Sequence, residues 1–288
     1  MKFALVKEHE PEFPVNVMCA VLEVSRSGYY AWRKRPESPR AQQRTRRLVA
    51  IRTAHAQSRR VYGSPRVHAA LRATGEACCV NTVARLMRED GLRAKARKKF
   101  RVTTNSSHDL PVAENLLGRD FSASAPNLKW VADITYIPTG EGWLYLGTEL
   151  DLHSRRLVGW AMSERIDADL VIAALKMAIE QRQPPAGLIH HSDRGGQYAS
   201  RRFRELLEAH GMKASMSRKA DVYDNAVMES CFGTLKKELV HDATYATRAE
   251  ARQAIFEYIE VFYNRQRRHS TLDYRSPAEY EAALAASP

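Results

Sequence analysis

The sequence predicts an α/β fold in which a mixed five-stranded sheet flanked by helices follows a mostly helical region. The first observation is a change of pattern near residue 128, where helical spacing gives way to strand-like runs. The second is the order of the later segments: three strands, then helix, strand, helix, strand and further helices. That order is typical of a mixed sheet with helices on both faces. The 288 residues allow about two domains.

Five segments after residue 128 have the character of strands. KWVADITYI and WLYLGTELD flank a glycine-containing turn, and RRLVGWAM returns as a third strand after a turn near His153. LIHHS and KASMS supply the other two strands. Residues 167–181, before LIHHS, carry a helical stripe that stops before Pro184, and RRFRELLEAHG, between LIHHS and KASMS, reads as a helix ended by Gly211.

The first 100 residues predict a helical DNA-binding region. Residues 14–34 indicate a short helix followed by a turn at Ser27-Gly28, and residues 41–57 indicate a long helix. Residues 60–92 then read as helix-turn-helix. Its first helix has Pro65 in the first turn and ends at Gly75; its second is capped by Asn81 and closed by Gly91.

In the second of these helices, Thr82, Arg85 and Arg88 are expected to face DNA. The apolar side chains between them pack inward, namely Val83, Leu86 and Met87. A small helical bundle with no role in DNA binding is the alternative. The basic run LRAKARKKFR that follows favours DNA.

Charge separates the chain into two parts. Residues 1–120 hold 24 Lys and Arg against 11 Asp and Glu, whereas the remainder holds 21 against 22. A basic region joined to a nearly neutral, acid-bearing region indicates a nucleic-acid-binding region attached to a catalytic domain. The alternative is that the basic residues form a solvated surface with no such role. Polar composition over 101–127 predicts a linker, so we expect domains over 1–100 and 128–288.

No membrane or disulfide-bonded class is indicated. The start MKFALVKEHEPEF lacks the apolar centre of a signal peptide, and no apolar run reaches the length of a membrane span. The four cysteines form no CxxC pair, so neither a zinc site nor a disulfide framework is expected. We therefore expect a cytoplasmic protein; a bacterial, nucleoid-associated one is what the family resemblance described below implies.

Three acids carry the functional prediction: Asp133 in a strand, Asp193 at a strand exit and Glu229 in a later helix that Asp224 is expected to cap. Lys236 follows Glu229 by seven residues, nearly on the same helix face. A carboxylate within an apolar strand is costly unless it is paired or binds metal. Taken singly, Asp133 could pair with an arginine, Asp193 could form a turn, and Glu229 with Lys236 could be a solvated pair. Their joint occurrence in this order favours one site.

Such a site suits phosphodiester chemistry. Two Mg²⁺ ions about 4 Å apart activate an attacking oxygen and stabilise a leaving oxygen at phosphorus, and Mg²⁺ prefers carboxylate oxygens. Asp133 is expected to bridge the ions, with Asp193 and Glu229 each completing one shell; Mn²⁺ is expected to be able to substitute. His190 and His191 could be metal ligands, but successive strand residues face opposite ways, so at most one could face the site. A role in the core or in support of the ligands is therefore favoured for both. One basic cluster either contacts DNA or forms a solvated helix surface, and the sequence does not favour one role over the other: Arg265, Arg267, Arg268 and His269.

Several motifs together resemble a known family: DITYI, GWLYLGTELDLHSR, GLIHHSDRGGQY, SMSRK, DNAVMES, TLKKEL and FYNRQRRHSTLDYRSP. They are similar to the catalytic core of DDE transposases and retroviral integrases, and more narrowly to the second-reading-frame protein of bacterial insertion-sequence family three. YYAWRKR and the segment from YGSPRVH to GLRA extend the resemblance over nearly the whole chain. GGQY and DVYDN depart from the commoner GSQY and NCWDN, and the integrase zinc module is absent from the sequence.

The resemblance implies a ribonuclease-H-like core, with Asp133, Asp193 and Glu229 as catalytic triad and metal ligands and Lys236 as a DNA contact. It implies cleavage at element ends to free a 3′-OH, and transfer of that hydroxyl into another strand. Implied partners are double-stranded DNA of the terminal repeats and target, further copies of the chain on DNA, and an upstream-frame protein joined by frameshifting. A ribonuclease H or junction-resolving nuclease, and a DNA-binding regulator with an inactive core, are the alternative functions.

Overall fold

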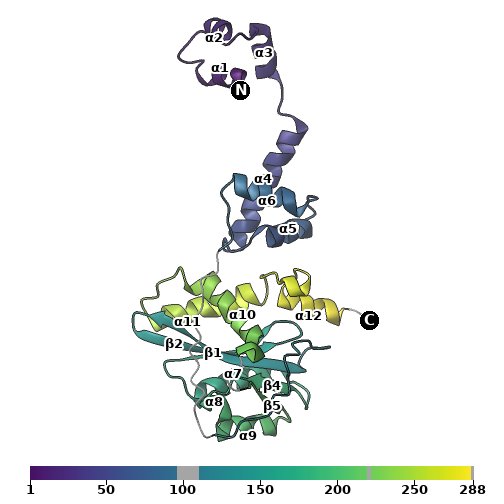
Figure 1. Cartoon of the computed structure of the whole chain (residues 1–288), viewed down its shortest axis with the longest axis vertical. Helices are drawn as coiled ribbons and strands as arrows, with labels where there is room; N and C mark the ends of the chain where they lie inside the picture. Colours follow the sequence, from purple (N-terminus) through teal and green to yellow (C-terminus); the bar gives the residue numbers. More distant parts are fainter. Residues whose placement is uncertain (96–109, 219–221, 287–288) are drawn as a thin grey trace. The chain divides into compact units, whose positions relative to one another are not determined.

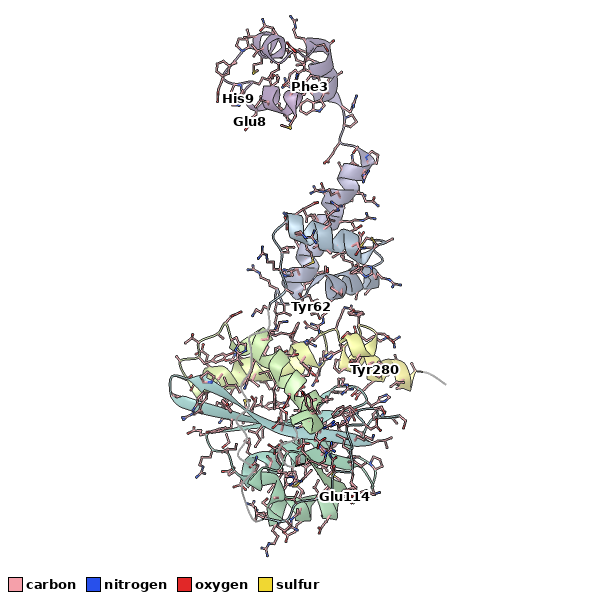
Figure 2. All side chains as sticks on the ribbon, in the orientation of Figure 1. Phe3, Glu8, His9, Tyr62, Glu114 and Tyr280 are labelled. Carbon is pink, nitrogen blue, oxygen red and sulfur yellow. The ribbon has the colours of Figure 1, made fainter. Side chains whose placement is uncertain are left out.

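The computed structural model describes residues 1–95, 110–218 and 222–286, and it divides into compact units over Met1–Thr53 and Ala54–Pro288. In the first unit, Val6, Cys19 and Tyr29 form a small core against which Phe3 packs (Figure 2). The turn predicted at Ser27-Gly28 was wrong. Both residues lie in the first turn of a helix, because the Ser25 side chain accepts a hydrogen bond from the Gly28 N–H and caps it. The helices of this unit are α1 (Lys2–Glu8), α2 (Val15–Val21) and α3 (Arg26–Lys34).

The predicted long helix is α4 (Pro39–Gln57), which begins in the first unit and ends in the second. Two short helices follow, α5 (Ser64–Ala73) and α6 (Val80–Glu89), as the helix-turn-helix pattern predicts. Asn81 does not cap α6. The Cys79 carbonyl accepts the first hydrogen bonds, from the N–H groups of Thr82 and Val83, so the helix starts earlier and Asn81 lies within it.

The sheet has five strands in the order β3-β2-β1-β4-β5. The pairs β1/β2 and β2/β3 are antiparallel, whereas β1/β4 and β4/β5 are parallel, which confirms the predicted mixed sheet. Strand lengths follow the sequence pattern: β1 (Lys129–Thr139), β2 (Gly142–Asp151), β3 (Leu157–Ser163), β4 (Ile189–Ser192) and β5 (Lys213–Met216).

Helices cover both faces of the sheet (Figure 1). On one face lie α7 (Ala168–Arg182), α8 (Gly196–Ala199) and α9 (Arg201–Ala209), and on the other α10 (Ala226–Leu235) and α11 (Arg248–Glu257). The α7 face holds the main core, to which Trp130 and Ala132 of β1 contribute. Because side chains alternate along a strand, Asp133 points to the opposite face, where α10 packs on β1.

Residues 110–121 lie against the core, although residues 101–127 were predicted as a linker. The Leu116 N–H donates to Ser215 Oγ at 2.9 Å, and the Met216 N–H donates to the carbonyl of Glu114, which Figure 2 labels. Residues 96–109, including most of the basic run after α6, lie outside the described part. Among the helices described, none is long and apolar enough to cross a membrane.

The C-terminal segments after α10 complete the second unit. Lys236–Val240 and Tyr258–Tyr263 are π-helical extensions of α10 and α11. Helix α12 (Pro277–Ala285) starts with a capping box, in which Ser276 and Glu279 each accept a hydrogen bond from the other's N–H. Short 3₁₀ turns span Val222–Asn225 before α10 and Ser270–Leu272 before α12.

Candidate active site

The backbone register places Asp133 and Asp193 side by side. β1 and β4 are parallel neighbours with Val131 opposite His191, and each aspartate lies two residues further along its own chain. Parallel neighbours are about 4.8 Å apart, so the two carboxylates start from adjacent positions. Asp133 Oδ1 accepts the Ile134 N–H at 2.7 Å, and Asp193 Oδ1 accepts the Gly195 N–H at 2.9 Å.

Glu229 reaches the same edge from α10. It lies in the first turn of the helix, where the helix dipole favours a negative charge. Asn225, the N-cap residue, donates from Nδ2 to the Ala132 carbonyl at 3.1 Å and so fastens the start of α10 to β1, one residue before Asp133. Sequence reasoning missed this role of Asn225; its position before the acidic helix was the only available signal.

The three acids interact electrostatically. Burial raises the pKa of the Asp133 carboxyl well above its ordinary value, and the nearby negative charges of Asp193 and then Glu229 raise it further. Lys236 opposes that rise. Within the described residues no three His, Cys, Asp or Glu side chains already form a closed metal-binding cluster. The three carboxylates therefore influence one another electrostatically, although in the described structure they do not already form such a cluster.

Lys236 lies at the junction between α10 and its π-helical extension, and its side chain is buried. Its Nζ sits 4.7 Å from the centroid of the Tyr136 ring, a contact that stabilises a cation. Burial lowers the pKa of Lys236, whereas the charge of Asp133 works in the opposite direction. The lysine is thus the positive member of the acidic group, on the same helix as Glu229.

Asp224 was expected to cap the helix that carries Glu229, and that expectation was wrong. Its carboxylate is fully buried and accepts hydrogen bonds from the Arg218 backbone and guanidinium at 2.8–3.0 Å. Arg119 and Asn115 donate to it as well. Three partners from two other segments outcompete the helix N–H groups, so Asp224 instead ties the segment preceding α10 to the rest of the core.

Replacing Asp224 by Asn is expected to lower the free energy of unfolding by about 2 kcal/mol at pH 7, because charged hydrogen bonds are lost. The hydrogen bonds from Arg218 hold the pKa of Asp224 well below its ordinary value. The stabilisation is therefore present above the unfolded pKa of about 3.9 and is lost as pH falls below it. Urea unfolding should therefore show a smaller difference in free energy of unfolding between Asp224→Asn and the unmodified protein at pH 3 than at pH 7. Asp169→Asn, at an exposed ion pair, should change little at either pH.

His190 and His191 are buried, as expected for core residues. His190 Nε2 hydrogen bonds to the buried Glu149 carboxylate at 2.8 Å. His191 hydrogen bonds to Ser215 and Ser217 on β5 and just after it. Burial lowers the pKa of His191 to about 4, so this ring is neutral at pH 7 and serves to join β4 to β5.

The basic cluster 265–269 fits neither of its two predicted roles as a whole. Arg267 is buried and forms a bidentate ion pair with Glu238, with Nε and Nη2 at 2.8 and 2.9 Å from the carboxylate oxygens. His269 is buried beside it. Glu238 lies in the π-helical extension of α10, and sequence alone could not identify it as the partner of Arg267. Arg265 is exposed, and its contact with DNA stays a prediction.

The DNA-contact candidates lie together on α6. Arg85 and Arg88 are exposed, Thr82 is half-buried, and Val83, Leu86 and Met87 are buried, which matches the predicted inward face. Arg85 pairs with Glu89 at 2.7 Å, and Thr82 Oγ1 contacts Cys79 Sγ at 3.3 Å. Thr82, Arg85 and Arg88 thus lie on one helix. The three acids and Lys236 form a separate group where β1 and the end of β4 meet α10.

Three family models match parts of the chain. Integrase core domain models match residues 123–221 and 229–283, and an HTH-like domain model matches residues 42–100. Two solved structures are distantly similar. One is the simian T-cell lymphotropic virus intasome in complex with PP2A regulatory subunit B56 gamma (16% identity, 76% of this chain and 72% of that chain, TM-score 0.48). The other is the HTLV-2 integrase catalytic core domain in complex with magnesium (17%, 56% and 99%, TM-score 0.43).

Curated relatives are far closer in sequence. The chain is 49% identical over 263 residues to the uncharacterized 31 kDa protein of insertion element IS600 from Shigella sonnei, covering 91% of this chain and 97% of that protein. It is 46% identical over 283 residues to the transposase InsF of insertion sequence IS3A from Escherichia coli (strain K12), covering 98% of both. With these relatives and the matches to integrase core domain models, the chain belongs to the IS3 family of insertion-sequence transposases.

Proposed function

We propose that Asp133, Asp193 and Glu229 form the catalytic site of this transposase and hold divalent metal ions there. The observation that carries the proposal is their convergence: adjacent positions on parallel strands, a helix fastened to β1 by Asn225, and mutual effects of charge on the Asp133 carboxyl. Three carboxylates with one lysine leave a local excess of negative charge, and cations relieve such an excess.

The donor set fits hard cations. All three ligands offer carboxylate oxygens, which Mg²⁺ prefers, and Mn²⁺ accepts the same ligands. His190 and His191 are already engaged in the core and supply no donor. We propose that two ions would be held by the carboxylates of Asp133, Asp193 and Glu229, which come from neighbouring strands and from the helix that packs on β1. When bound, the ions supply Lewis-acid activation of the attacking oxygen and charge neutralisation at the leaving oxygen.

The chain's own groups position the DNA for two in-line displacements at phosphorus. In the first, water adds to phosphorus and the bond to O3′ of the element end breaks, which leaves a 3′-OH and a 5′-phosphate. In the second, that 3′-OH adds to a phosphorus of another strand and displaces its O3′. Lys236, buried next to Asp133, is placed to hold a non-bridging phosphate oxygen. No side chain has to act as the nucleophile.

We propose that α6 contacts the element's terminal repeats through Arg85, Arg88 and Thr82. The exposed arginines lie on the second helix of a helix-turn-helix, the usual position for groove contacts. We also propose that two or more copies act together on DNA, since an element has two ends and each chain contributes one acidic group. An upstream-frame protein fused to this chain stays part of the proposal.

A strand-transfer assay tests the reaction. Full-length protein is incubated with a duplex of the terminal repeat, either intact or already cut to expose the 3′-OH, and a target duplex. We expect both substrates to be joined to target with Mg²⁺ or Mn²⁺, and neither with EDTA. Cutting of the intact duplex without any joining of the pre-cut one would indicate a nuclease. Binding without nicking in Mg²⁺ would indicate a regulator with an inactive core.

A further inference from the structure

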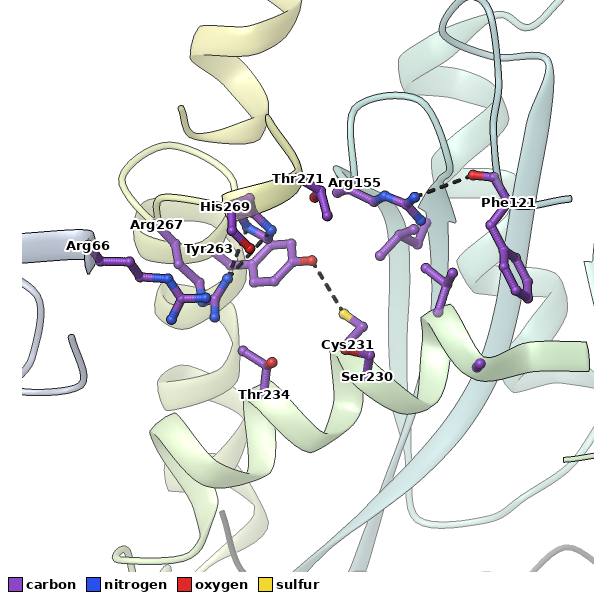
Figure 3. A pocket seen from close by; sticks show the side chains of 14 residues that line it. Arg66, Phe121, Arg155, Ser230, Cys231, Thr234, Tyr263, Arg267, His269 and Thr271 are labelled. Carbon is purple, nitrogen blue, oxygen red and sulfur yellow. Dashed lines mark hydrogen bonds between the residues drawn. The ribbon is translucent and has the colours of Figure 1, made fainter. Parts of the chain in front are cut away.

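A cavity of about 310 Å³ lies beside α10 within the second unit. Its wall is formed by α10, by residues that follow β2, and by the segment between α11 and α12 (Figure 3). Most of the side chains labelled in Figure 3 are polar, and Leu150 and Val227 add apolar surface to the lining. Besides Tyr263 and His269, the polar lining has three guanidinium groups and four aliphatic hydroxyls: Arg66, Arg155, Arg267, Ser230, Thr234, Ser270 and Thr271.

The guanidinium groups are only partly neutralised. Arg267 is paired with Glu238, and Arg66 Nη1 lies 3.8 Å from the same carboxylate, so one acid faces two cations. Among the described residues, the Arg155 guanidinium makes a single hydrogen bond, from Nη2 to the Phe121 carbonyl at 3.3 Å. Most of its five N–H groups are therefore available to a ligand. Arg155 also has a left-handed backbone (φ 59), an uncommon conformation for a residue other than glycine.

His269 reports the positive field in this cavity. Burial and then the charges of Arg267, Arg66 and Arg155 lower its pKa to about 2. The ring is consequently neutral at physiological pH and adds no charge of its own. A cavity with surplus guanidinium charge and four hydroxyl groups is suited to an anion with several acceptor oxygens, which describes a phosphate group.

The cavity and the acidic group share one helix. Successive residues of an α-helix are rotated by about 100°, so the cavity-lining residues Val227, Ser230 and Thr234 lie about 100–160° around α10 from Glu229. Lys236 returns to the Glu229 side. One face of α10 therefore presents the catalytic group, and the other face presents the cavity.

We propose that this cavity binds a backbone phosphate of a DNA strand that passes α10 on the side opposite Glu229. The inference rests on the proposed function for the identity of the ligand, since DNA is the polyanion on which a transposase acts. Arg155 supplies the main charge, and the hydroxyls of Ser230 and Thr234 orient the phosphate oxygens. Such a contact fixes the position of the catalytic helix on bound DNA without touching the reacting phosphorus.

The test compares two variants of nearly equal size at one position. Thr234→Asp introduces a negative charge into the cavity, whereas Thr234→Asn introduces none. The full-length variants are titrated with a terminal-repeat duplex by fluorescence anisotropy in EDTA, so the outcome does not depend on catalysis by the triad. We expect Thr234→Asp to bind at least about tenfold more weakly than Thr234→Asn. Equal affinities would overturn the proposal. The new carboxylate can pair with the guanidiniums, so the fold should survive, and thermal unfolding checks this.

A second variant removes a cavity charge directly. Arg155→Gln is expected to weaken DNA binding about tenfold and to reduce the salt slope by about one. Arg201→Gln, at an exposed position on α9, loses the same charge and should change affinity less than about twofold. Equal effects of the two substitutions would overturn the assignment to this cavity.

Inorganic phosphate separates DNA from a free anion as the ligand. At equal ionic strength, phosphate should displace DNA from the unmodified protein more strongly than chloride does, and this preference should vanish in Thr234→Asp. If the preference is found but Thr234→Asp binds DNA as the unmodified protein does, the cavity takes free phosphate and the DNA assignment is wrong.

Discussion

Asp133→Asn, Asp193→Asn and Glu229→Gln are each expected to reduce end cleavage and strand transfer by about 10³-fold or more, equivalent to about 4 kcal/mol of transition-state stabilisation. Each change keeps the size of the side chain and removes one charged oxygen ligand from the group that converges at the edge of β1 and β4. Cleavage of a terminal-repeat duplex and joining of a pre-cut one measure the two steps. Substantial activity in one variant would remove that residue from the site.

Two controls separate this loss from unfolding and from loss of DNA. Asp133→Asn should unfold at a higher temperature than the unmodified protein in EDTA, because burial and Asp193 destabilise the ionised Asp133 carboxyl. DNA affinity should change little in all three variants.

Lys236→Ala should behave differently from the three acid variants. It should weaken binding of the element end and lower the reaction rate, while Mn²⁺ should still raise the unfolding temperature of the protein. Unchanged activity of Lys236→Ala at low DNA concentration would make Lys236 a packing residue.

Glu238→Gln is expected to lower the free energy of unfolding by about 3–5 kcal/mol, since it leaves the buried charge of Arg267 without its partner. Glu238 accepts two hydrogen bonds from Arg267 and one from the Tyr258 hydroxyl at 2.8 Å, and its side chain is 1% exposed. Urea unfolding measures the change. Neutralising one partner of an exposed pair by Glu205→Gln should lower the free energy of unfolding by less than about 0.5 kcal/mol.

A double-mutant cycle tests whether the pair itself is responsible. Arg267→Met alone leaves a buried carboxylate and should also destabilise strongly, whereas the Glu238→Gln and Arg267→Met combination should recover much of the loss. Additive losses would mean that the two residues act independently, and would contradict the ion pair as the source of stability.

Local patterns determined the elements that position the acids. Alternation in KWVADITYI, the stop at Pro184 and the order of later segments led to the five strands and to helices on both faces, all of which the structure contains. These features depend on periodicity and turn residues, which are properties of neighbouring residues. The predictions at Ser27-Gly28 and Asn81 were wrong because each helix begins earlier than expected, after Ser25 and after Cys79.

The sequence by itself determined the fold class, the family and the candidate acids with Lys236, because strand and helix periods and motif order are written in the chain. Only the tertiary structure decided which polar residues form buried ion pairs that stabilise the fold. Asp224 was expected to be a helix cap and Arg267 a surface or DNA-binding cation. Both are instead buried in ion pairs with residues from other segments, Arg119 for Asp224 and Glu238 for Arg267. A buried charge requires a partner in space. Which partner it finds, and which cations such as Arg155 keep hydrogen-bond donors to spare, depends on contacts between residues far apart in the chain.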